Sequence, residues 1–212
     1  MPSQEEINDR LPLINFKNIE LKKETLEVFL NQRGMKIGLG SVGQGYTVDQ
    51  IVLFLKQKGH KSGYVDASGD IHFWGTKPYG SLWTAAIRDP RDKQKIIGRV
   101  YGTNFSITTC GDDEKFFIKN GKRIHHIIDP KTGLSSDKAR QVTVISKSTL
   151  FADAWDTASF VLGVDKAMPI LNKKHLASFF VNKENKVIIS KNLILKTNSQ
   201  WGDYYELPSD LK

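Results

Sequence analysis

Residues 36–46 read KIGLGSVGQGY, and the structure that this stretch adopts decides the fold. It contains GLGSVG, a literal match to the G-x-G-x-x-G pattern of dinucleotide-binding folds. Apolar residues then recur at helical spacing, at Val48, Ile51, Val52 and Leu55. Gly59 is typical of a helix end. The pattern predicts a glycine loop that opens an amphipathic helix.

The sequence after this helix argues against a doubly wound dinucleotide-binding domain. Asp66 stands about where a ribose-binding acid is expected, but that fold needs further strand-helix-strand crossovers. Residues 62–128 instead form short alternating runs, and Asn120-Gly121 is a strong hairpin signal. We therefore predict an α+β fold with antiparallel sheets and packed helices, which disfavours a nicotinamide-dependent oxidoreductase. The strands are expected at 63–67, 71–74, 82–88, 96–101, 105–109, 115–119 and 123–128.

The remaining segments are predicted to complete a single domain over residues 1–212. Ser3 is the expected N-cap of a helix that ends near Leu11, and Ser148 that of a helix ended by Gly163. The tail from Lys191 has no firm assignment, although Trp201, Tyr204 and Tyr205 indicate that it packs. Further strands are expected at 15–21, 25–30, 142–146, 178–182 and 186–189, and further helices at 148–162 and 164–172.

Composition narrows the classes of partner. Thirty-one Lys and Arg against 23 Asp and Glu give a net charge of +8, which favours anionic partners such as nucleotides or acidic proteins. The lysines are scattered rather than gathered with aromatic residues, so no nucleic acid is expected. No apolar run reaches the length of a membrane helix, and no signal peptide is seen, which leaves the compartment open. The single cysteine, Cys110, excludes an internal disulfide.

The glycine loop has two interpretations. Closely spaced glycines let the backbone approach a ligand, and amides at the start of the helix near Gly43 would face an anion. Alternatively, Gly38, Gly40, Gly43 and Gly45 only allow a tight turn and close helix packing. The residues themselves leave both open.

The helix at 148–162 carries a second candidate site. Asp153 and Thr157 are four residues apart and project from one face, where a carboxylate and a hydroxyl can serve as oxygen ligands of Mg²⁺. The alternative is a structural role, in which Asp153 caps or pairs with a neighbouring group and the Thr157 hydroxyl donates a hydrogen bond to a helix carbonyl. Neighbouring His125 and His126 are predicted on one strand, where successive side chains point to opposite faces, so they cannot both serve one site.

Taken in order, four motifs resemble the ApbE family of FAD:protein FMN transferases: GLGSVGQGYTVD at 38–49, SGDI at 68–71, HHIIDPKTG at 125–133 and ADAWDTASFVLG at 152–163. The resemblance spans about residues 3–190. It implies a tunnelling-fold-related α+β domain that binds FAD and, with Mg²⁺, cleaves its pyrophosphate. FMN would pass to a Thr or Ser hydroxyl of an acceptor protein with release of AMP, although some members hydrolyse FAD instead.

The resemblance also implies site residues. Asp153 and Thr157 match the side-chain metal ligands, and Ser41 matches the loop position that completes the metal site. His126 matches a histidine near the flavin and is expected, with Asp153, to be catalytic. The cofactor cleft would be lined by Gly40, Ser41, Gly43, Gln44, Gly69, Gly111 and His126.

The chain departs from the family pattern at several positions. Gly38 replaces an Asp that would contact the cofactor or acceptor, Gln44 stands where Lys or Glu is common, and Cys110 replaces a Ser before Gly111. Family members also have a further N-terminal segment, so we expect an N-terminally truncated domain. Either the chain is a truncated paralogue, or a partner or, in a homodimer, a second copy supplies the missing wall. With such a segment the resemblance implies the cell envelope or periplasm. The alternative function is a non-catalytic flavin-nucleotide-binding or interaction paralogue.

Overall fold

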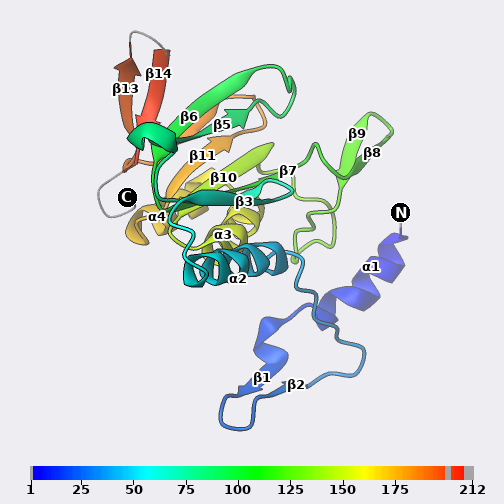
Figure 1. Ribbon diagram of the computed structural model, residues 1–212. Helices are drawn as coiled ribbons and strands as arrows, with labels where there is room; N and C mark the ends of the chain where they lie inside the picture. The colour runs from blue at the N-terminus through cyan, green and yellow to red at the C-terminus, as the bar shows by residue number, and fades with distance from the viewer. Residues whose placement is uncertain (1, 199–201, 208–212) are drawn as a thin grey trace.

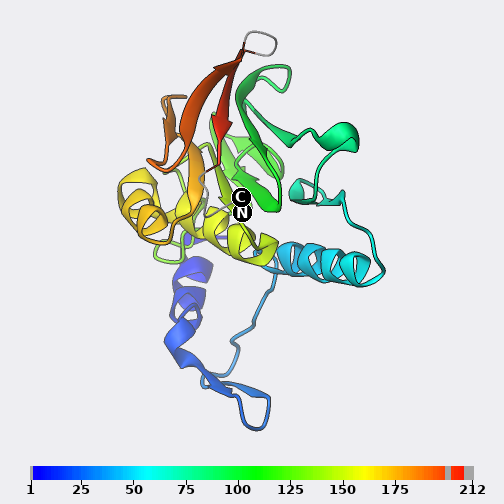
Figure 2. The ribbon, with the colours of Figure 1, turned by 60° about the vertical axis from the view of Figure 1, so that its left-hand side comes forward.

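The computed structural model describes residues 2–198 and 202–207 and consists of layers (Figure 1). Two long helices cover one face of a six-stranded sheet, and a four-stranded sheet packs against the other face. An N-terminal segment with a short helix and a hairpin extends away from these layers (Figure 2). The helices are α1 (Gln4–Arg10), α2 (Gly43–Gln57), α3 (Thr149–Leu162) and α4 (Val164–Lys173).

Both main sheets are built largely from antiparallel pairs, which confirms the predicted α+β class. The one parallel pairing among the described strands joins β14 to β6. The six-stranded sheet has the order β12 (Val187–Ile189), β11 (Ala177–Val181), β10 (Gln141–Ser146), β7 (Phe105–Gly111), β4 (Asp70–Trp74) and β3 (Gly63–Ala67). The four-stranded sheet has the order β13 (Ile194–Asn198), β14 (Gly202–Glu206), β6 (Ile96–Gly102) and β5 (Trp83–Arg88).

Two separate hairpins complete the strands: β1 (Ile19–Lys22) with β2 (Glu27–Leu30), and β8 (Phe116–Lys119) with β9 (Lys122–His125). The turn between β8 and β9 confirms the sequence signal. Asn120 and Gly121 both have positive φ, 51° and 72°, as a tight hairpin turn requires.

Two predicted strands are wrong at one end. At 15–21 the strand begins only at Ile19, because the Asn15 side chain accepts a hydrogen bond from the Lys17 N–H (3.1 Å) and starts a 3-10 turn over Phe16–Asn18. At 123–128 the strand ends at His125, and Ile128 instead forms an isolated bridge with Ser135. In both places local polar contacts outweigh the strand propensity of the apolar residues.

The tail forms the β13–β14 hairpin, which the sequence left unassigned. Tyr204 contacts Tyr101 edge to face at 4.7 Å between ring centroids, and Tyr205 contacts Phe179 at 5.0 Å. These contacts confirm that the tail packs, while Trp201 lies outside the described residues.

Apolar side chains fill the space on both sides of the six-stranded sheet. Phe105, Ile107 and Phe179 contribute to the cluster between the two sheets, and Val142 and Phe160 to the cluster beneath α3. In the described part of the chain, no helix is long and apolar enough to cross a membrane.

The junction of α2 and α3 positions the site. Asp49 of α2 accepts hydrogen bonds from the Ser148 hydroxyl (2.7 Å) and from the N–H groups of Thr149 (2.8 Å) and Leu150 (3.1 Å). The Asp49 carboxylate therefore satisfies amides that α3 leaves unpaired and favours the positive end of its dipole. Ser148 also caps α3 as predicted, by accepting from the Phe151 N–H (3.2 Å).

Candidate functional site

A cavity of about 550 Å³ lies where the glycine loop, the start of α2, β7 and α3 meet. It brings together most of the predicted site residues, which come from distant parts of the chain. Two predicted residues are absent from this lining. Gly69 lines a neighbouring cavity, and Gly43, the first residue of α2, lies outside the lining. The predicted residues that line the cavity are Gly40, Ser41, Gln44, Gly111, His126, Asp153 and Thr157.

Asp153 is held by the start of α2. Its Oδ2 accepts a hydrogen bond from the Gly45 N–H at 3.0 Å, and the residue is only 6% exposed. Burial raises the pKa of this carboxyl, and the hydrogen bond from Gly45 acts in the opposite direction. The second carboxylate oxygen accepts no hydrogen bond within the described chain, so it is available to a ligand in the cavity.

The two interpretations of the glycine loop apply to different glycines. A Cβ on Gly45 would lie 2.6 Å from the Thr149 carbonyl oxygen and 2.8 Å from Leu150 Cα, so only glycine lets α2 approach α3 this closely. A Cβ on Gly38 or Gly40 would meet nothing within 4 Å. Close helix packing therefore explains Gly45 but not Gly38 or Gly40.

Thr157 has a partner that sequence reasoning missed. Its hydroxyl donates to Asp156 Oδ1 at 3.0 Å, and both residues line the cavity. The Thr157 oxygen also carries two lone pairs, with which it can coordinate a cation. Burial raises the pKa of Asp156 well above its usual value. Asp153 and Asp156 are three residues apart in the sequence, a spacing that places both side chains on neighbouring positions of one helix face.

Asp70 is a second missed residue of the cavity. Burial, together with smaller contributions from the nearby carboxylates of Asp153, Glu114 and Asp66, raises its pKa to about 7. Lys115 is a cation in the same lining. The accumulation of buried carboxylates around Asp153 is unfavourable without a counter-charge, which a divalent cation would supply.

The donor types at the cavity suit Mg²⁺. Within residues 2–198 and 202–207, no three His, Cys, Asp or Glu side chains converge in a group that could hold a metal ion. The candidate ligands are instead one carboxylate from Asp153, one hydroxyl from Thr157 and the loop at Ser41, all hard oxygen donors. Mg²⁺ typically uses one or two carboxylates and completes its shell with water and phosphate oxygens.

The two adjacent histidines point to opposite sides, as predicted. His125 is buried, its Nε2 lies 2.8 Å from the Ser136 carbonyl oxygen, and its ring stands edge-on to Phe160. Burial lowers the pKa of His125. His126 is exposed and lines the cavity, so it is the histidine available for chemistry.

An ion-pair network that the sequence did not indicate fixes the chain next to Gly111. The Asp112 side chain is 4% exposed and receives two hydrogen bonds from Arg91, at 2.7 and 2.6 Å, and one from Arg140 at 3.3 Å. Burial alone would raise the pKa of Asp112, but the hydrogen bonds and charges of Arg91 and Arg140 outweigh it and hold the pKa below its usual value.

The lowered pKa makes part of the stability depend on pH. The contribution of Asp112 is fully present above its unfolded-state pKa of about 3.9 and is lost as the pH falls through the lower folded-state pKa. We expect Asp112→Asn to lower the free energy of unfolding at pH 7 by about 1–3 kcal/mol and to flatten its decline below pH ~5. Urea unfolding over a pH series measures both effects. Exposed Asp137→Asn is the control, and equal curves for the two variants would contradict the assignment.

Comparison with known proteins identifies the family. Residues 1–180 match the ApbE family. The chain belongs to the ApbE family. Among curated ApbE relatives, an FAD:protein FMN transferase of Klebsiella pneumoniae is 34% identical over 90% of this chain and 59% of its own length. An FAD:protein FMN transferase of Escherichia coli is 31% identical over 87% of this chain and 54% of its own length. The chain thus spans little more than half of these relatives.

Solved ApbE structures match the fold. The crystal structure of the ApbE protein from Thermotoga maritima superposes with a TM-score of 0.84, at 29% identity over 90% of this chain and 62% of that one. The apo flavinyl transferase ApbE from Pseudomonas stutzeri superposes with a TM-score of 0.77, at 30% identity over 90% of this chain and 60% of that one. The ApbE fold predicted from the sequence motifs is confirmed, while the roles of the individual site residues stay predictions.

Proposed function

We propose that this chain binds FAD and, with Mg²⁺, transfers FMN to a Thr or Ser hydroxyl of an acceptor protein with release of AMP. The observation that carries the proposal is the single cavity lined by Ser41, Asp153 and Thr157. More than a hundred positions separate Ser41 from Asp153, and the contacts of α2 with α3 bring them together. The curated relatives are FAD:protein FMN transferases, which supports the same activity here.

The chain offers groups for both the metal and the phosphates. Asp153, Thr157 and the backbone at Ser41 would hold Mg²⁺, which supplies charge neutralisation on the pyrophosphate oxygens. Helix α2 begins at Gly43 without a side-chain cap, so the positive end of its dipole favours an anion beside the cavity. Gln44 is oriented by its side-chain hydrogen bond to the Ala67 carbonyl oxygen (3.1 Å).

The transfer forms and breaks one bond at a single phosphorus atom. The acceptor hydroxyl oxygen attacks the phosphorus of the FMN half, the bond from that phosphorus to the bridging oxygen breaks, and AMP leaves with the bridging oxygen. His126, exposed at the cavity, would take the hydroxyl proton. Such transfers depend mainly on positioning and charge stabilisation.

The proposal is tested with the purified chain, FAD, Mg²⁺ and a Thr-containing acceptor protein. We expect AMP to appear in equal amount to acceptor that is covalently fluorescent, and chelation of the metal to stop both. AMP with free FMN would show an FAD hydrolase. Bound FAD without AMP would leave a flavin-binding paralogue and refute the transferase proposal.

Gly38 provides a test of how far this activity depends on a residue that the family pattern supplies. A Cβ added at this position would meet no atom within 4 Å, so there is space in which to begin the Asp side chain of Gly38→Asp. We expect the added carboxylate to restore a polar contact to the cofactor or acceptor and to raise kcat/KM about tenfold. The measurement is the rate of AMP release, with Gly38→Asn as the uncharged control. An unchanged or lower rate would show that Gly38 does not limit activity.

A further inference from the structure

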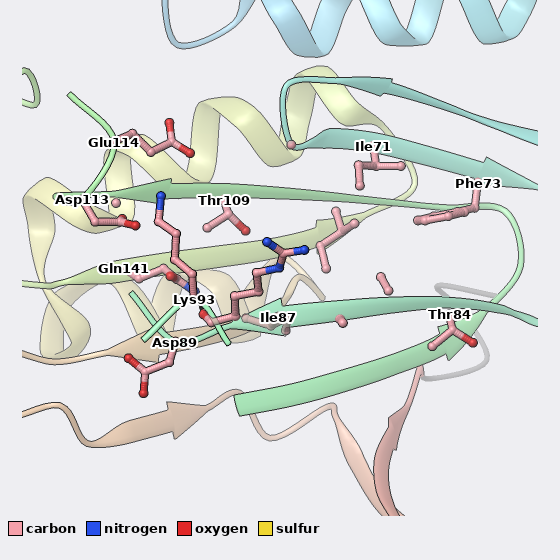
Figure 3. A pocket seen from close by; sticks show the side chains of 16 residues that line it. Ile71, Phe73, Thr84, Ile87, Asp89, Lys93, Thr109, Asp113, Glu114 and Gln141 are labelled. Atoms are coloured by element: carbon pink, nitrogen blue, oxygen red, sulfur yellow. Dashed lines mark hydrogen bonds between the residues drawn. The ribbon is translucent and has the colours of Figure 1, made fainter. Parts of the chain in front are cut away.

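The four-stranded sheet presents an open edge to a second cavity. This cavity has a volume of about 420 Å³ and lies between the two sheets (Figure 3). Five consecutive residues of β5, Thr84 to Arg88, line it, and Ile71 and Ile107 of the larger sheet line the opposite side. In the described part of the chain β5 pairs with β6 alone. Alternate backbone N–H and C=O groups of an edge strand point away from its partner, so those of β5 are left without a strand to pair with in the described chain.

The cavity is continuous with the candidate active site. Thr109, Gly111 and Glu114 line both. At its other end Thr84 also lines a further hollow of about 580 Å³, beside Tyr101 and Tyr204. The hollows therefore follow β5 along its length and end at the site where FAD would be cleaved.

Two cations of the cavity lining, Lys93 and Arg88, make no ion pair or side-chain hydrogen bond within the described chain. Lys93 extends across the mouth toward Asp113 and Glu114 (Figure 3), and Asp89 lies 3.9 Å from Lys95 Nζ. The register between β5 and β6 shifts between Ile87 and Arg88, so the regular alternation of side chains is interrupted just before Arg88.

We propose that the β5 edge binds the hydroxyl-bearing segment of the flavin-acceptor protein as an added strand, with an acidic side chain of that segment paired to Arg88. The proposal rests on the proposed function, because continuity with the active site is what would deliver the Thr or Ser hydroxyl to the phosphorus. Strand addition supplies affinity through main-chain hydrogen bonds, and alternate side chains supply specificity. The net charge of +8 favours an acidic acceptor over a basic one.

Backbone pairing is tested directly by hydrogen exchange on the full chain. The probe is a synthetic extended peptide with one Thr and, on the same face, one Asp. We expect the peptide to protect amides of β5 and to leave those of β12, an edge strand of the six-stranded sheet, unchanged. Two versions of the peptide distinguish strand addition from other modes of binding. One is N-methylated at the odd-numbered residues and the other at the even-numbered residues. One version should bind and the other should not, because only one set of N–H groups faces β5. Equal binding of both versions would overturn the proposal.

The role of Arg88 is tested by Arg88→Gln, with Lys196→Gln as the control. Lys196 is an exposed cation on β13 of the same sheet and lies outside the cavity lining. We expect Arg88→Gln to raise the KM for the peptide about tenfold with little change in kcat or in FAD affinity. Replacing the peptide Asp with Asn should have the same effect, and the two changes together no more than either alone. Equal KM values for wild type and Arg88→Gln would overturn the acidic contact.

The exchange experiment separates this proposal from the transferase activity. If the chain releases no AMP but the peptide protects β5, strand addition at the β5 edge is supported and the proposed function is refuted. If the chain transfers FMN while β5 stays unprotected, only the proposal of strand addition at the β5 edge is refuted. Protection of β5 by a second copy of the chain, seen as concentration-dependent dimerisation without peptide, would also refute the acceptor as its occupant.

Discussion

Asp153→Asn is expected to reduce FAD cleavage by roughly three orders of magnitude while the chain stays folded. The amide oxygen of Asn can still accept the hydrogen bond that Gly45 donates at 3.0 Å, so the contact between α2 and α3 is kept. The variant loses the negative charge that would hold Mg²⁺. The rate of AMP release and calorimetric titration of Mg²⁺ in the presence of FAD measure the two losses.

Stability separates this role of Asp153 from a structural one. The residue is 6% exposed, and burial disfavours its charged form. Without metal, the variant should therefore have a free energy of unfolding equal to or above that of the wild type at pH 7. Exposed Asp165→Asn is the control for both measurements. If Asp153→Asn unfolds the chain or keeps full activity, the carboxylate is not a metal ligand.

Gly45→Ala is expected to lower the free energy of unfolding by about 1–3 kcal/mol, even though alanine favours helices over glycine by up to about 1 kcal/mol. The new methyl group would lie 2.6 Å from the Thr149 carbonyl oxygen, and backbone atoms cannot rotate aside as side chains do. The two helices must separate, which also moves the Gly45 N–H away from Asp153. Urea unfolding measures the loss, and Mg²⁺ titration measures the displacement of the ligand.

Gly43→Ala is the matched control because it lies two positions earlier in the same helix. Its added Cβ would be 4.0 Å from Leu39 Cβ, an ordinary contact, so its stability should equal or exceed that of the wild type. A Gly45→Ala variant as stable as Gly43→Ala would mean that the helices approach less closely than described.

Local sequence signals predicted most of the elements. The spacing of apolar residues identified α2, the Ser148 cap and Gly163 stop bounded α3, and Asn120-Gly121 placed the β8–β9 turn. These signals depend on contacts between near neighbours in the chain. The β13–β14 hairpin carries no such turn signal among the described residues, and its packing depends on aromatic partners far away in sequence, so it was missed.

The residues of the candidate site also fall into two groups, those that sequence motifs predict and those that depend on contacts formed on folding. The resemblance to the ApbE motifs predicted that Ser41, Asp153 and Thr157 belong to one site. The contributions of Asp70 and Asp49 depend on which groups surround them after folding, and no spacing rule reveals that. Gly45 was one of four glycines with the same two explanations, and the distance to Thr149 assigned it to packing.

The parallel pairing of β14 with β6 has a consequence for the order of folding. Val100 is opposite Tyr205, so this contact closes a very long stretch of chain, whereas the β5–β6 and β13–β14 hairpins close short ones. Loop closure of that length slows a contact, so each hairpin should be formed before the two dock. In a refolding experiment the fluorescence of Tyr101 beside Tyr204 should therefore be among the last signals to recover.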